Sequence, residues 1–102
     1  MGAGDNPMSM MKVRFYATLR DIVGGGSVEV HLEPGSSAQQ LIELVVAQHP
    51  ALETALLDES RCLHEYLKMF INGREVVYLE GQFLYVLQPT DTVDIFPPVG
   101  GG

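Results

Sequence analysis

The chain has 102 residues, with 13 acidic against 6 basic side chains, so its formal net charge is −7. This length and a hydrophobic content of 46% are typical of one small globular domain. The acidic balance argues against a nucleic-acid partner and against an anionic membrane surface as partner. No apolar stretch approaches the roughly 20 residues of a membrane span. The lone cysteine, Cys62, excludes an internal disulfide and a multi-cysteine zinc site, and it favours a reducing, cytoplasmic setting.

The first ten residues differ in character from the rest of the chain. They are small and polar, with no cationic stretch followed by an apolar one, so we do not expect a secretory signal. Gly2 suggests myristoylation, but that motif needs Ser or Thr where this chain has Asn6. We interpret residues 1–10 as a disordered extension or an expression remnant, residues 11–96 as a folded domain and residues 97–102 as a flexible glycine-rich tail.

Two early segments alternate between polar and apolar residues, which is the pattern of half-buried strands. The first covers residues 12–17, with Ala17 at the end of its apolar face. The second covers residues 27–32. Residues 19–26, which end in three glycines, are expected to be a flexible loop. Together the two segments predict an antiparallel hairpin.

A helix is predicted to begin after Ser37, because Ser37 and Gln40 have the spacing of a capping box. Apolar residues then recur at helical spacing from Leu41 onward. The helix should end just before Pro50, since the residue before a proline is biased out of the helical conformation. A second, shorter helix is expected over residues 51–57.

The last third of the chain favours strands. Residues 66–71 and 74–78 flank an Asn-Gly dipeptide, which is typical of a two-residue hairpin turn. Residues 83–87 form a short apolar run that we expect to be a strand or an edge segment, and residues 92–96 alternate again as the last strand. This order of hairpin, helix and further strands predicts an α+β fold in which the helix covers one face of a single sheet.

The usual signatures of an active site are absent from the sequence. The three histidines are scattered without the spacing of metal ligands. The glycines at 24–26 are not followed by the Lys and Ser or Thr of a phosphate-binding loop. No nucleophile and base stand in a recognisable local arrangement. We therefore expect the chain to bind no metal or cofactor of its own.

The C-terminal residues carry the most specific pattern in the chain. The prolines at 97–98 lack an amide donor and have a fixed φ, so they stop sheet pairing and stiffen the exit from the last strand. The glycines at 100–102 have no side chains and can enter a channel too narrow for other residues. Extended, residues 99–102 reach about 13 Å. The carboxylate at the tip is ionised at neutral pH.

The segment 96–102, FPPVGGG, resembles the C-terminal signature of the MoaD family, the small subunits of molybdopterin synthase and related ubiquitin-like sulfur carriers. The segments 13–20 (VRFYATLR), 71–76 (INGREV) and 91–95 (DTVDI) resemble the first strand, an internal hairpin and the last strand of that family. The resemblance spans nearly the whole domain. It implies a ubiquitin-like β-grasp fold, a mixed sheet with one main helix on one face and with the first and last strands adjacent.

The resemblance also implies a mechanism. A ubiquitin-activating-type enzyme holding ATP and Mg²⁺ would adenylate the terminal carboxylate, which would then accept sulfur and become a thiocarboxylate. In the molybdopterin branch, the tail enters the large catalytic subunit of molybdopterin synthase and donates sulfur to a pterin precursor. This chain would then be a sulfur-carrying subunit and co-substrate without an active site of its own.

The resemblance assigns roles to the residues of the tail. Gly102 carries the reacting carboxyl, Gly101 and Gly100 allow passage, Pro97, Pro98 and Val99 orient the tail, and Phe96 contacts a partner. Strand parity places Phe96 on the face opposite the apolar side of the last strand, together with Arg14 and Tyr16 if the first strand is its neighbour. There it is either an exposed anchor for a partner or packed against the chain's own loops.

Other functions stay open at this point. The chain could carry sulfur for thiamin or cysteine synthesis instead of molybdopterin synthesis. It could also be a ubiquitin-like modifier that is joined to substrate lysines through Gly102. The simplest alternative is a small interaction domain whose glycine tail has no chemical role.

Overall fold

The computed structural model describes residues 9–98. Five strands form one sheet: β1 (Ser9–Phe15), β2 (Ser27–Leu32), β3 (Lys68–Ile71), β4 (Arg74–Glu75) and β5 (Val93–Phe96). Their order across the sheet is β2-β1-β5-β3-β4. Strand β5 is parallel to β1 and antiparallel to β3, so the first and last strands are adjacent at the centre of a mixed sheet.

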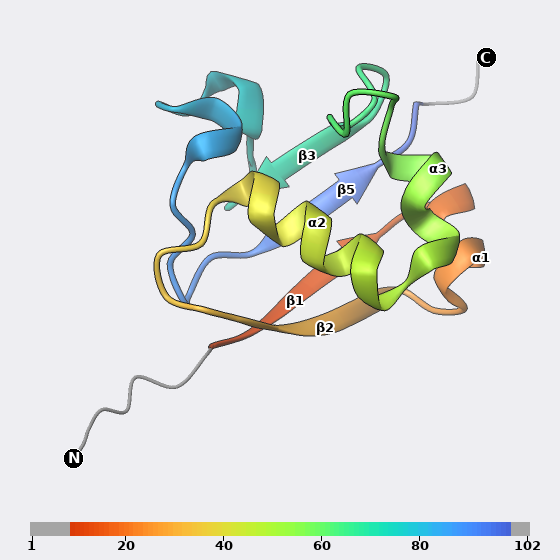
Figure 1. Cartoon of the computed structure of the whole chain (residues 1–102), viewed down its shortest axis with the longest axis horizontal. Helices are drawn as coiled ribbons and strands as arrows, with labels where there is room; N and C mark the ends of the chain where they lie inside the picture. The colour runs from red at the N-terminus through yellow and green to blue at the C-terminus, as the bar shows by residue number, and fades with distance from the viewer. Residues whose placement is uncertain (1–8, 99–102) are drawn as a thin grey trace.

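Helices lie against one face of this sheet, with α2 crossing in front of β1 and β5 (Figure 1). The α-helices are α1 (Thr18–Val23), α2 (Ala38–Gln48) and α3 (Glu53–Leu56). Short 3-10 helices are η1 (Pro50–Leu52), η2 (Val76–Tyr78) and η3 (Gln82–Leu84). One long helix on a mixed sheet with parallel terminal strands confirms the predicted ubiquitin-like β-grasp fold. Over residues 9–98, no helix is long and apolar enough to cross a membrane.

Helix α2 begins with the predicted capping box. The Gln40 backbone amide donates to the Ser37 hydroxyl at 3.2 Å, and the Ser37 backbone amide donates to the Gln40 side-chain oxygen at 2.8 Å. The helix ends at Gln48, and His49, the residue before Pro50, has left the helical conformation, as expected. Its buried side chains, including Leu41 and Val45, meet the inward side chains of the central strands in one core.

The segment 19–26 is not a plain loop, so that prediction was wrong. Residues Thr18–Val23 form α1, which buries Leu19 and ends at Gly24 in the left-handed conformation. A six-residue helix is too short to show a clear helical period in the sequence, and the glycines that follow it suggest a loop. The prediction that Ala17 continues the apolar face of the first strand was also wrong. Strand β1 ends at Phe15, and Ala17 is exposed at the start of α1 with a φ of 54°.

The predicted strands of the last third are shorter in the structure. Strand β3 begins at Lys68, and β4 ends after Glu75, where Val76 turns into the core as part of η2. Residues 83–87 contribute the end of η3 and one isolated bridge from Val86, and they form no strand. Alternating apolar residues predict strands only where a partner strand is available, and β3 pairs with β4 over two residues.

The folded domain extends further toward the N-terminus than the predicted boundary at residue 11. Strand β1 begins at Ser9, because Ser9 and Met10 pair with Leu32 and His31 of β2. Residues 1–8 of the predicted extension lie outside the described residues.

Replacing Ser37 by Ala should lower the free energy of unfolding by about 1 kcal/mol, because the helix loses the acceptor for its Gln40 amide. Urea denaturation measures the change. The control is Ser36→Ala, which removes a hydroxyl that donates to the exposed Glu33 carbonyl, outside the capping box. An equal loss in both variants would contradict the capping role of Ser37.

Candidate functional site

The candidate site lies where the chain leaves β5. Phe96 is the last residue of the strand and is half-buried, Pro97 is half-buried, and Pro98 is exposed. The structure thus brings three of the predicted site residues together at the edge of the domain. The other four, at positions 99–102, lie outside the described residues.

Three aromatic rings meet beside this exit, one just after β1, one in β3 and one in β5, and we call Tyr16, Phe70 and Phe96 the aromatic platform. The Tyr16 and Phe96 rings are stacked, with centroids 4.2 Å apart and planes 12° apart. The Phe70 ring meets Phe96 edge-on, at 5.5 Å and 89°. Phe96 therefore packs between Tyr16, which follows β1, and Phe70 of β3, and it remains partly exposed.

An open groove of about 540 Å³ runs along the platform to the exit of the tail. Its lining residues are Tyr66, Lys68, Phe70, Phe96, Pro97 and Pro98. The lining is mainly aromatic and prolyl, with one cation from Lys68, whose ammonium lies 3.5 Å from Glu75. Such a concave apolar surface can accept an apolar side chain of a partner protein.

A buried carboxylate lies beside the platform. Asp94 is 8% exposed, and among residues 10–98 it is the one polar side chain in the buried class. The Arg14 guanidinium reaches both of its oxygens, from Nε at 2.7 Å and from Nη2 at 3.3 Å. The Tyr16 hydroxyl donates to Asp94 Oδ1 at 2.7 Å. This hydrogen bond, together with partial burial of the phenol, raises the pKa of Tyr16.

The alternating patterns placed Arg14, Tyr16 and Phe96 on one face, with Asp94 on the same side of the last strand, but they marked neither Phe70 nor Asp94 as a site residue. Both follow from strand register, since Asp94 lies opposite Arg14 in β1 and opposite Phe70 in β3. Alternation along β5 was a usable signal for Asp94, because it puts this residue on the face of Phe96. The position of Phe70 depends on β3 lying next to β5, which no local pattern reveals.

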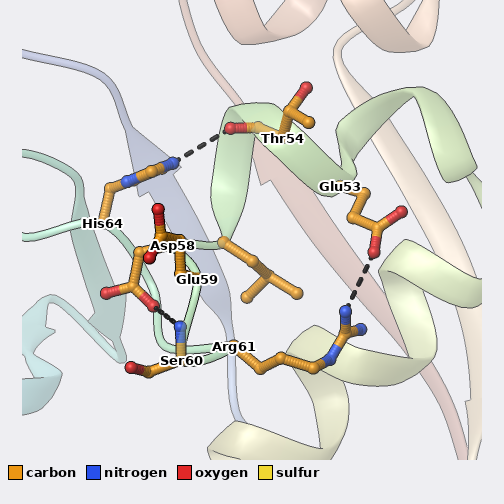
Figure 2. Close-up of a pocket in the computed structure, with 8 residues that line it drawn as sticks. Glu53, Thr54, Asp58, Glu59, Ser60, Arg61 and His64 are labelled. Carbon is orange, nitrogen blue, oxygen red and sulfur yellow. Dashed lines mark hydrogen bonds and ion pairs between the residues drawn. The ribbon is translucent and has the colours of Figure 1, made fainter.

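A second, larger pocket of about 860 Å³ lies beyond α3 (Figure 2). Figure 2 shows polar contacts within this pocket: Arg61 pairs with Glu53, and the His64 ring faces the Thr54 backbone carbonyl. Both distances are 2.9 Å. Arg61 also pairs with Glu43 at 2.6 Å. No group of three potential metal ligands occurs in the described part of the chain. These contacts hold a surface loop in place.

Residues 13–102 match the sequence model of the ThiS family. The chain belongs to the ThiS family. This membership confirms the resemblance to ubiquitin-like sulfur carriers of the MoaD type. It also establishes the broad class of the protein, a family of ubiquitin-like sulfur carriers and modifiers.

Relatives of this ThiS-family chain have different named roles. Small archaeal modifier protein 3 of Haloferax volcanii is 30% identical over 90% of this chain and 98% of its own length. The molybdopterin synthase sulfur carrier subunit of Chlamydomonas reinhardtii is 26% identical over 90% of this chain and 98% of its own. A chain in the crystal structure of the Amycolatopsis orientalis BexX/CysO complex superposes with a TM-score of 0.74 at 28% identity, covering 90% of this chain and 99% of that one.

We predict that the phenol of Tyr16 titrates above its usual value of 10.0 and that Asp94→Ala lowers this pKa. Because the pKa is raised in the folded state, the bond stabilises the fold fully below pH 10.0 and is lost as the pH rises through the folded-state value. Following the Tyr16 ring carbon by NMR against pH measures the shift. An unchanged Tyr16 titration in Asp94→Ala would contradict the assigned cause.

Proposed function

We propose that this chain carries sulfur as a thiocarboxylate on Gly102 and serves as the small subunit of molybdopterin synthase. The observation that supports this most is the exit of the tail. Phe96, Pro97 and Pro98 lie along an apolar groove, so a partner bound there would receive the segment that follows directly. Family membership and the similarity to a molybdopterin synthase sulfur carrier subunit support the same function.

The proposed activation has two steps. One oxygen of the Gly102 carboxylate attacks the α-phosphorus of ATP, which forms an acyl-adenylate and releases pyrophosphate. Hydrosulfide then attacks the acyl carbon, a carbon–sulfur bond forms, and the carbon–oxygen bond to AMP breaks. The products are the thiocarboxylate, AMP and one proton. ATP and Mg²⁺ belong to the adenylating enzyme in this scheme, and this chain contributes its terminal carboxyl as substrate.

Two partners follow from this scheme, an adenylating enzyme of the ubiquitin-activating type and the large catalytic subunit of molybdopterin synthase. Both would have to take a thin tail into an enclosed site while holding the domain outside. Glycines at 100–102 suit a narrow channel, and the prolines at 97–98 separate the tail from the sheet. A structural relative in the BexX/CysO complex supports the use of this fold together with a second protein.

A second candidate is a protein modifier joined to lysines through Gly102. The named role of small archaeal modifier protein 3, at 30% identity, favours it. Both functions share the adenylated glycine and differ in the nucleophile that follows, an amine in place of hydrosulfide. Conjugates of this chain that form in cells and then survive denaturation and reduction of the extract would support the modifier role, because an isopeptide bond resists thiols.

The carrier role predicts one oxygen-to-sulfur exchange on the last residue when the chain is incubated with a purified adenylating enzyme, ATP, Mg²⁺ and sodium sulfide. Intact-mass spectrometry detects the exchange. A chain lacking Gly102 should fold normally and acquire no sulfur. A chain lacking Gly2 has the same composition and should be loaded like the full chain, so equal loading of both deletions would reject the role of Gly102.

Replacing Phe96 by Ala should weaken binding to the adenylating enzyme about tenfold or more, because a large aromatic contact at the groove is lost. Isothermal titration calorimetry measures this affinity. The melting temperature of the variant should stay close to that of the wild type. The control is Tyr78→Ala, a more exposed aromatic that does not line the groove. A sharp fall in melting temperature with unchanged affinity would show that Phe96 is a packing residue only.

A further inference from the structure

The side-chain bonds of Asp94 tie β5 to the end of β1 on the outer face of the sheet. Its carboxylate holds Arg14 of β1 and Tyr16 just after β1, and its register neighbour in β3 is Phe70. Tyr16 stacks on Phe96, two residues further along β5. Asp94 thus connects directly to one ring of the aromatic platform and, through that ring, to the residue before the tail prolines.

A stabilising role alone does not account for this carboxylate. Burying a charge costs free energy that its partners only partly return, and apolar side chains of similar size often serve stability as well or better. Arg14 is half exposed, so its ion pair is also screened by water. What the carboxylate does supply is direction, because a short charge-assisted bond fixes where the Tyr16 hydroxyl lies.

The direction of Tyr16 matters for the ring that stacks on it. Stacking between two aromatic rings is a modest attraction, so a stacked ring is held more firmly when its partner is fixed at a second point. Asp94 provides that second point for Tyr16, and Phe70 bounds Phe96 on the other side at 5.5 Å. The Phe96 side chain is therefore held between a fixed ring and an edge, next to the first proline.

We propose that Asp94 is a positioning residue that holds Tyr16, and through it Phe96, in the orientation that a partner protein binds. This inference rests on the proposed function and adds to it the residue that preorganises the docking surface. A preorganised platform is bound in one state and loses less side-chain entropy on docking, so the effect of Asp94 falls on affinity. Rates at saturating carrier should change little, because the reacting carboxyl itself is untouched.

The chain offers a matched pair of variants to test this role. Tyr16→Phe keeps the ring and removes only the hydroxyl that donates to Asp94. Tyr85→Phe removes a hydroxyl that donates to Asp91 at 3.0 Å, away from the groove. We expect Tyr16→Phe to raise the KM for the carrier in ATP–pyrophosphate exchange about five- to tenfold with kcat unchanged, the size expected when one more side chain must be ordered on docking. Tyr85→Phe should keep the wild-type KM.

Replacements of Asp94 separate positioning from charge. Asp94→Ala removes the acceptor for Tyr16 and should raise the KM at least as much as Tyr16→Phe. Asp94→Asn keeps a side-chain oxygen that can accept the Tyr16 hydroxyl and should recover most of the lost affinity. In proton NMR, the ring-current shifts of Phe96 should shrink in Asp94→Ala and stay near wild-type values in Asp94→Asn.

The outcomes distinguish this role from the function on which it rests. A wild-type chain that is never adenylated or loaded with sulfur overturns the proposed function and this role with it. A loaded wild type with equal KM values for Tyr16→Phe and Tyr85→Phe overturns the positioning role alone. Unchanged Phe96 shifts in Asp94→Ala also overturn the positioning role, whatever the loading assay gives.

Discussion

The parallel pairing of β1 with β5 is the constraint on which the rest of the structure depends. It joins segments that lie about 80 residues apart, as the bond between Arg14 and Asp94 shows. Parallel neighbours need a long crossover, which here consists of β2, α2 and the segments up to β5. The pairing places the inward residues Val13 and Ile95 in the core beneath α2 and the outward residues of both strands side by side.

The outer face that this pairing creates differs electrically from the rest of the molecule. Lys12, Arg14 and Lys68 lie on it, which is three of the six basic side chains of a chain with net charge −7. Arg14 and Lys68 each lie within ion-pair distance of an acidic side chain on the same face, and Lys12 lies opposite Glu29 in the strand register. The face around the tail exit is thus near neutral and aromatic, whereas most of the excess acidic charge lies elsewhere. Like-charge repulsion at this face is correspondingly small.

The core and the proposed docking surface use different residues in this small domain. The core is made almost entirely of aliphatic side chains between α2 and the sheet, with Phe15 as a buried aromatic residue. The partly exposed aromatic residues Tyr16, Phe70 and Phe96 gather on the opposite side, beside Asp94. The larger pocket near Arg61 belongs to neither group, because its polar side chains bind each other and hold the loop after α3. The larger of these two pockets is therefore not the one that we propose as the docking surface.

The sequence by itself determined the features whose physical cause is local. Alternation predicted β2 and β5, the capping box predicted the start of α2, and the terminal signature predicted the family. The tertiary structure alone decided that 76–78 leaves the sheet and that Phe70 of β3 meets Phe96 at the tail exit. These outcomes depend on which strands are neighbours and in what register. That choice is made by contacts between distant segments, and no window of the sequence contains both partners.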